Sequence, residues 1–212
     1  MSKTYPISLL ITGKPVLVVG GGVVAARKVK GLTESGAQIT VVSPEVCEEL
    51  DQLIKQGACR WLERNYETAD LEGMELVFAC TNDEALNVRI SAEAGVRRIL
   101  VNVADRPELC TFFLPSVLRR GDLSIAVSTD GCSPLTARLI RESLESHVDD
   151  AMGAFLEVLH SWRPQVQEKL PPEKRMLFWE GAHNGQAYQF IKQGQREQAE
   201  AVLAQLFKEL QG

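Results

Sequence analysis

Short apolar runs alternate with helical periodicity along the first half of the chain. Five runs have the length and the content of β-branched residues that are typical of strands covered on both faces. These predicted strands are 15–19, 38–43, 59–62, 75–81 and 99–104. Helical spacing separates them, and the predicted helices are about 24–32, 45–56 and 83–94. Strands that alternate with helices predict an α/β fold with a doubly wound, Rossmann-type parallel sheet and right-handed crossovers.

The pattern changes after Asp105. The run 123–128 predicts one further strand, and Ser133-Pro134 then suits the N-cap and first turn of a helix that continues through Leu144. Beyond about 149 the spacing is helical only, with breaks expected at Pro164 and at Pro171-Pro172.

These changes predict three parts. They are a Rossmann domain at 1–112, a small α+β region at 113–148 and a helical C-terminal domain at 149–212. The stretch 113–144 is apolar but short for an independent core, so we expect a partner subunit to complete it.

Composition narrows the classes of partner. A net charge of -5 over 212 residues argues against a general nucleic-acid binder, because phosphate contacts need a basic surface. Apolar runs fall short of the roughly 18 residues of a membrane span, and the first residues lack the apolar core of a signal peptide. We therefore expect a cytoplasmic protein without a membrane partner.

The five cysteines are scattered and form no CxxC pair. We expect neither a disulfide framework nor a metal site, and interpret most of them as small buried hydrophobic residues.

Glycines follow the first predicted strand directly. Gly20-Gly21-Gly22-Val23-Val24-Ala25 fits G-x-G-x-x-A, and it stands between a strand and a helix. In this pattern Gly20 permits the tight turn, Gly22 lets a pyrophosphate approach the backbone, and Ala25 allows close helix–strand packing. The free N–H groups of the helix N-terminus would then face the anion. A glycine turn that binds nothing is the alternative.

The end of the second predicted strand lacks the usual acidic residue. Rossmann domains that bind NAD usually carry Asp or Glu there for the ribose hydroxyls. This chain has Ser43-Pro44, with Glu45 next, and no arginine that could meet a 2′-phosphate. Spacing alone therefore leaves the choice between NAD and NADP open.

Four ordered blocks of sequence are more specific than any of these patterns. The blocks are Val19 to Lys28; Ala79 to Asp83 with Asn87; Asn102 to Asp105 with Phe112 to Ser116; and Ile125 to Pro134 with Ala137-Arg138 and Arg141-Glu142. In them the chain resembles the siroheme synthase family in its short form, over roughly residues 5 to 150.

The resemblance implies a homodimer that uses NAD to oxidise precorrin-2 to sirohydrochlorin. Some members of the family also insert ferrous iron into sirohydrochlorin, and others stop at the dehydrogenation, so both alternatives stay open. The expected cofactor-binding residues are the glycine turn and the ends of the strands. They are Gly20, Gly21, Gly22, Val23, Val24, Ser43, Pro44, Thr81, Asn82, Asn102 and Val103.

Asp105 is the candidate catalytic residue. It lies just past the fifth predicted strand, at the carboxyl edge of the sheet where Rossmann ligands bind. A carboxylate there can act as a general base. From the sequence alone, a cap for the turn before Arg106-Pro107 is an equal alternative, and the resemblance favours catalysis.

A tetrapyrrole carries a rim of carboxylates, which an acidic protein must meet with local donors. The candidate arginines are Arg119, Arg120, Arg138 and Arg141. The loop before the predicted helix at Pro134 adds hydroxyl and N–H donors from Ser128, Thr129, Gly131 and Ser133. A dinucleotide-sensing regulator without catalysis is the remaining alternative, but it has no need of this second polar loop.

Overall fold

The computed structural model describes residues 3–212. The chain forms two compact units, Met1–Leu114 and Pro115–Gly212, and each is described by itself. The first boundary lies close to the one predicted at 112. The further division predicted at 148 stays a prediction.

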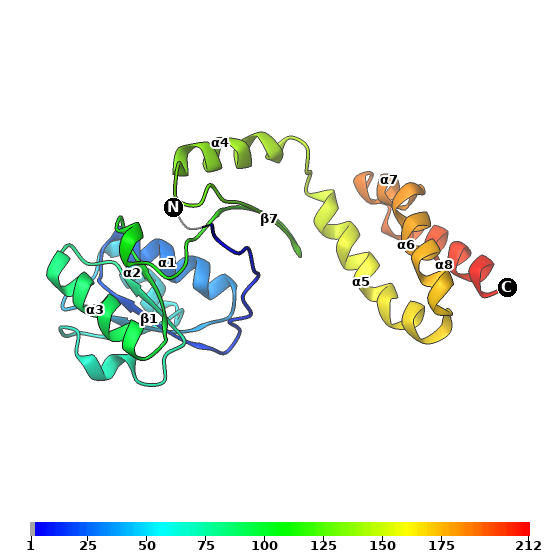
Figure 1. Ribbon diagram of the computed structural model, residues 1–212. Coiled ribbons are helices and arrows are strands. Elements are labelled where there is room, and N and C mark those ends of the chain that lie inside the picture. The colour runs from blue at the N-terminus through cyan, green and yellow to red at the C-terminus, as the bar shows by residue number, and fades with distance from the viewer. Residues whose placement is uncertain (1–2) are drawn as a thin grey trace. The chain divides into compact units, whose positions relative to one another are not determined.

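The first unit is a five-stranded parallel sheet (Figure 1). Its strands are β1 (Pro15–Val19), β2 (Gln38–Val42), β3 (Arg60–Leu62), β4 (Leu76–Ala79) and β5 (Leu100–Val103). Their order is β3-β2-β1-β4-β5, so the crossover from β3 to β4 passes over β2 and β1. All neighbouring pairs are parallel, for example Val18 against both Val41 and Phe78. The predicted parallel sheet is confirmed.

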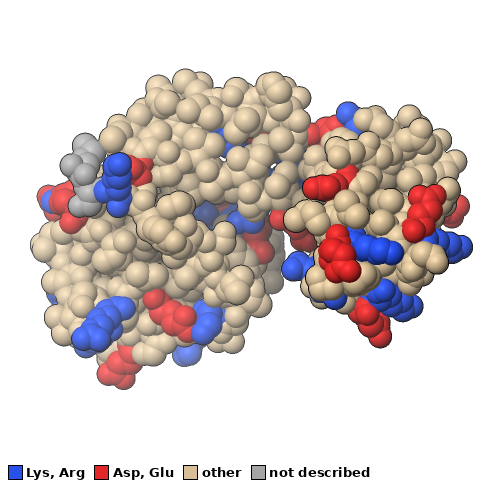
Figure 2. Space-filling view, turned by 45° about the vertical axis from the view of Figure 1, so that its right-hand side comes forward, with Lys and Arg blue, Asp and Glu red and all other residues tan. Residues whose placement is uncertain are grey.

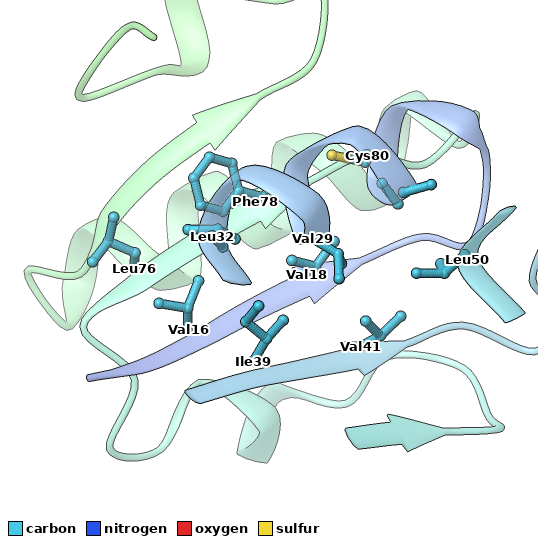
Figure 3. Packing of buried hydrophobic residues seen from close by; sticks show 12 residues of the cluster. Val16, Val18, Val29, Leu32, Ile39, Val41, Leu50, Leu76, Phe78 and Cys80 are labelled. Atoms are coloured by element: carbon cyan, nitrogen blue, oxygen red, sulfur yellow. The ribbon is translucent and has the colours of Figure 1, made fainter. Parts of the chain in front are cut away.

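Helices cover both faces of this sheet. On one face α1 (Val23–Glu34) and α2 (Glu48–Lys55) bury a cluster that includes Val18, Val29 and Phe78 (Figure 3). On the other face α3 (Glu84–Val96) packs Ile90 and Ala94 against Leu17 and Val77. Short 3₁₀ turns, η1 (Thr68–Leu71) and η2 (Pro107–Leu109), follow β3 and β5. The strands are apolar on both faces because both faces are buried.

The second helix begins later than its sequence predicted. We expected it from Glu45, and it begins at Glu48 because residues 43–47 instead fold over the glycine turn. The amide of Cys47 donates a 2.7 Å hydrogen bond to the carbonyl of Gly21, which holds this segment in a loop.

The second unit begins with an antiparallel hairpin of β6 (Ser116–Arg120) and β7 (Leu123–Val127). Only β7 was predicted, because β6 carries one buried residue, Leu118, and ends in two arginines. The helix α4 (Pro134–Glu145) follows, and the side chain of Ser133 caps it by accepting the amide of Thr136 at 3.2 Å.

Four helices complete the second unit. They are α5 (Ala151–Lys169), α6 (Pro172–Asn184), α7 (Ala187–Lys192) and α8 (Arg196–Gln211). Their common core is aromatic, with Phe178 packed against both Trp162 and Phe207. The fold class is confirmed: a Rossmann sheet, a small α+β region and a helical C-terminal part.

The break predicted at Pro164 is wrong. Pro164 lies inside α5, with Leu159 and Val166 buried on either side of it. The break at Pro171-Pro172 is confirmed, since α5 ends at Lys169 and α6 begins at Pro172.

Candidate dinucleotide and tetrapyrrole site

The glycine turn lies at the carboxyl edge of the sheet, between β1 and α1. Gly20 has a φ of +117°, and a Cβ there would lie 2.4 Å from the carbonyl oxygen of Cys80. At Gly21 a Cβ would lie 1.8 Å from the carbonyl oxygen of Glu45. Both residues must therefore be glycine for the protein's own packing.

Gly22 differs from its two neighbours. It is the N-cap of α1, its φ of -82° suits any residue, and a Cβ there would meet nothing within 4 Å. No acidic residue stands in the first turn of α1, and no side chain caps its N-terminus. The open space at Gly22 and the uncapped N–H groups together fit a dinucleotide pyrophosphate.

The other cofactor candidates are arranged around this turn. Val23 is 58% exposed at the start of α1, whereas Val24, the next residue of that helix, packs against the core. Ser43 is buried after β2, and its hydroxyl donates a 2.6 Å hydrogen bond to the carbonyl of Glu45. Pro44 and Glu45 are exposed next to it. Since the Ser43 hydroxyl is used within the loop, the exposed Pro44 and Glu45 are what this loop presents to a ligand.

The loop after β4 is held by a buried amide. Asn87 on α3 donates to the carbonyl of Thr81 at 2.9 Å and accepts the Thr81 hydroxyl at 2.8 Å. Asp83 caps α3 by accepting the amide of Leu86 at 3.0 Å. The loop therefore has a fixed shape, and it leaves Asn82 exposed at the carboxyl edge.

Asp105 lies past β5 at the same edge. It is exposed, and its φ of +59° places it in the left-handed region that residues other than glycine seldom adopt. Asn102 and Val103, predicted as cofactor contacts, are buried within β5. The Asn102 side chain donates a 3.0 Å hydrogen bond to the carbonyl of Phe112 and so points into the protein.

Lys28 is a residue of α1 that the sequence analysis did not single out as a candidate for the site. This half-buried lysine of α1 has its Nζ 5.8 Å from the centre of the Phe78 ring. Burial lowers the pKa of Lys28, and the nearby Cys80, Cys110 and Asp105 oppose that effect. Lys28 therefore lies within electrostatic range of Cys80, Cys110 and Asp105. The sequence does contain a signal for Lys28, because this charged residue stands next to the buried Val29 at a position of the helix that faces inward.

The loop before α4 uses most of its donors locally. The Thr129 hydroxyl donates to the carbonyl of Ser133 and accepts its amide, both at 3.1 Å. The Ser133 side chain caps α4, and the amide of Asp130 bonds to the Ser128 hydroxyl at 3.3 Å. Gly131, at a φ of +80°, is exposed. Ser128 and Gly131 are therefore the two predicted residues that this loop leaves exposed to a ligand.

Each candidate arginine has a partner within the second unit. Arg119 bonds to the Ser124 hydroxyl at 3.1 Å, and Arg138 to Glu142 at 2.7 Å. Arg120 Nε lies 2.8 Å from an Asp150 oxygen without the alignment of a hydrogen bond. Arg141 pairs with Glu142 and Glu145. A substrate carboxylate would have to compete with these acidic partners.

Neither the distribution of charged side chains in Figure 2 nor the metal-ligating side chains of residues 3–212 indicates a further binding site. On the face seen in Figure 2, acidic and basic side chains are interspersed. Residues 3–212 hold no group of three or more His, Cys, Asp or Glu that could bind a metal ion. Of the five cysteines Cys80 alone is buried, three are half-buried and Cys132 is exposed, so the prediction that most of them are buried is wrong. Within the same range, no helix has the length and hydropathy to cross a membrane.

Comparison with protein families divides the chain in a similar way. A family model described as putative NAD(P)-binding matches residues 7–116, which is more than half of the chain. A model described as sirohaem biosynthesis protein central matches 120–147, and one described as sirohaem synthase dimerisation region matches 151–207. The chain belongs to the siroheme synthase family. The description of this last model places dimerisation in the helical part, whereas the sequence analysis expected a partner subunit to complete residues 113–144.

Individual members of the family align with nearly the whole of this chain. Siroheme synthase of Photorhabdus laumondii is 40% identical over 98% of this chain and 45% of its own length. The one of Zymomonas mobilis is 41% identical over 94% of this chain and 43% of its own length. The chain thus spans less than half the length of these curated relatives. A solved structure described as SirC, precorrin-2 dehydrogenase, matches with a TM-score of 0.77 at 29% identity, covering 97% of this chain and 100% of that one.

Proposed function

We propose that this protein oxidises precorrin-2 to sirohydrochlorin with NAD as the hydride acceptor. The observation that carries the proposal is the carboxyl edge of the sheet. There the glycine turn, with its open Gly22, and the exposed Asp105 end strands of one parallel sheet. The precorrin-2 dehydrogenase that matches nearly the whole chain supports the choice of reaction.

The residues at this edge of the sheet would have separate roles in binding NAD and in accepting a proton. NAD supplies the chemistry of hydride acceptance. Gly22 and the first amides of α1 would hold the pyrophosphate, and the fixed loop at Thr81-Asn82 would limit where the nicotinamide half can lie. Asp105 would accept the proton that leaves the tetrapyrrole with the hydride, so the two hydrogens removed are both accounted for. In the second unit, taken by itself, Ser128 and Gly131 remain the predicted donors for carboxylates of a tetrapyrrole.

The decisive assay follows absorbance as purified protein converts precorrin-2 in the presence of NAD, with NADP as the comparison. Turnover with NAD is the expected result. NAD binding without turnover would instead support a regulator. The expected cytoplasmic location and homodimer remain predictions.

Asp105 is tested by Asp105→Asn, which tolerates the left-handed backbone better than alanine. We expect kcat to fall by about 10²–10⁴-fold, the usual contribution of a general base, with NAD affinity and melting temperature retained. If Asp105 only caps a turn, turnover would persist and stability would fall by about 0.5–2 kcal/mol. Asp51→Asn, a half-exposed carboxylate on α2 that pairs with Lys55, is the matched control and should leave kcat unchanged.

Iron insertion is a separate question, with ferrous iron as a substrate. Relatives named siroheme synthase motivate it. Incubation with sirohydrochlorin and ferrous or cobalt ion, without NAD, distinguishes a bifunctional enzyme from a dehydrogenase alone. Loss of both activities in Asp105→Asn would indicate one shared tetrapyrrole site.

A further inference from the structure

β5 is an edge strand whose outward amides are bonded by side chains. The amide of Val101 donates to the Thr111 hydroxyl at 2.8 Å, and the amide of Val103 donates to the Cys110 sulfur at 3.2 Å. The amide of Thr111 returns a 2.8 Å bond to the carbonyl of Val101. Residues 110–111 therefore take the place of a neighbouring strand, and two side chains stand where its carbonyls would be.

The Cys110 thiol also closes the turn that carries Asp105. Its sulfur lies 3.3 Å from the carbonyl oxygen of Val103 and 3.4 Å from that of Arg106, so its one proton reaches a carbonyl on either side of Asp105. Burial raises the pKa of Cys110, which keeps it a thiol that can donate and accept at once. The two contacts lie on either side of Asp105, the one residue of this turn with a positive φ.

Asn102 anchors the same returning segment from within β5. Its amide donates to the carbonyl of Phe112 at 3.0 Å and lies 3.7 Å from the Cys110 sulfur. The Phe112 ring then packs edge-on against Phe78, at 5.6 Å between ring centres. The segment that holds the Asp105 turn is thus fixed to the core of the sheet.

We propose that Cys110 is a positioning residue for Asp105, acting through the Val103–Arg106 turn. The proposal rests on the proposed function, in which Asp105 takes the proton. A left-handed aspartate is costly and persists only when its surroundings enforce it. Sulfur suits this role because its hydrogen bonds of 3.2–3.4 Å are longer than those of a hydroxyl, so serine cannot reach all three partners at once.

The test compares Cys110→Ala and Cys110→Ser with a matched control, Cys59→Ala. Cys59 is half-buried like Cys110, and burial raises its pKa as well, but it lies just before β3. In Cys110→Ala we expect kcat to fall by roughly 10- to 100-fold, as for a displaced catalytic group, with the KM for NAD unchanged. Cys110→Ser should recover part of the loss, and Cys59→Ala should show none.

A double variant separates positioning from general damage. In the Asp105→Asn background, Cys110→Ala should lower kcat no further, because the group that it positions is already gone. An independent, further loss would overturn the proposal. Full kcat in Cys110→Ala beside an active wild type would also overturn it, while an inactive wild type would refute the proposed function itself.

A ligand-free measurement completes the test. Amide hydrogen exchange at residues 103–106 should become faster in Cys110→Ala than in the wild type or in Cys59→Ala. Unchanged exchange there would show that the thiol does not hold the turn and would overturn the proposal.

Discussion

Three consecutive glycines precede α1, and glycine is needed at these positions for different physical reasons. Gly20 and Gly21 leave no room for a Cβ against the carbonyls of Cys80 and Glu45, and Gly20 also needs its positive φ. Gly22 has room and an ordinary φ. The protein's own packing therefore explains two of the glycines, and for the third we propose a ligand, the pyrophosphate of NAD.

This difference predicts opposite results for two alanine variants. Gly20→Ala should lower the free energy of unfolding by about 1–3 kcal/mol, as overpacking does. Gly22→Ala should unfold like the wild type but bind NAD about tenfold or more weakly, since about 1.4 kcal/mol of lost contact is tenfold. Urea unfolding and calorimetry check the pair, and a wild-type NAD affinity in Gly22→Ala would contradict the pyrophosphate assignment.

Because of Cys80, we expect the free energy of unfolding to fall as the pH rises into the alkaline range. Burial raises the pKa of its thiol from 9.0 to about 11, and Lys28 opposes the shift. The unfolded chain therefore loses this proton first, so the stabilising contribution is complete below pH 9 and is lost as pH rises towards 11. Between pH 8 and 10.5 the free energy of unfolding should fall by about 2 kcal/mol more in the wild type than in Cys80→Ala. Parallel pH dependence of the two proteins would contradict this.

At the scale of elements, α5 shows how packing overrides a local signal. A proline inside a helix removes a hydrogen bond and costs about 3 kcal/mol. The helix continues through Pro164 because Phe155, Val158 and Val166 bury its inner face in the second unit. Tertiary contacts hold a helix that its own sequence would interrupt.

Because Pro164 itself is exposed, Pro164→Ala should stabilise the second unit. The variant restores a backbone donor without changing the core. We expect the free energy of unfolding to rise by about 1–3 kcal/mol. Chemical unfolding followed by tryptophan fluorescence checks this, with Trp162 and Trp179 in the second unit and Trp61 in the first as the reference signal. Unchanged or lower stability would mean that the helix is already adjusted to the proline.

At the scale of the whole molecule, the second unit exposes an apolar helix face. On α4, Leu135, Leu139 and Ile140 are 64%, 55% and 44% exposed. Such a continuous apolar stripe on a helix indicates a surface that another chain covers. It agrees with the prediction that a partner subunit completes residues 113–144.

We therefore expect sedimentation to show a homodimer at micromolar concentration. Leu139→Lys should shift it to monomer, because a buried ammonium without a counter-charge is costly. Val96→Lys, which changes an 84% exposed apolar residue on α3, is the control and should stay dimeric. A monomeric wild type would refute the prediction, and a dimeric Leu139→Lys would place the interface elsewhere.

The sequence by itself determined the first unit almost completely. Continuous apolar runs are characteristic of strands buried on both faces, and the glycine turn directly after β1 predicted where a dinucleotide would bind. These signals are local, so they need no knowledge of distant residues. The strand β6 was not predicted, because one buried residue and two arginines do not form the local pattern of apolar positions that a strand prediction needs.

Only the tertiary structure decided which side chains are available to a ligand. It turned Asn102 inward to Phe112, used Thr129 and Ser133 within their own loop, and paired Arg138 with Glu142. It also folded Cys110 back onto the turn that carries Asp105. Spacing along a chain shows which residues share an element, but hydrogen bonds between segments depend on how those segments pack, and this packing decides which donors remain for chemistry.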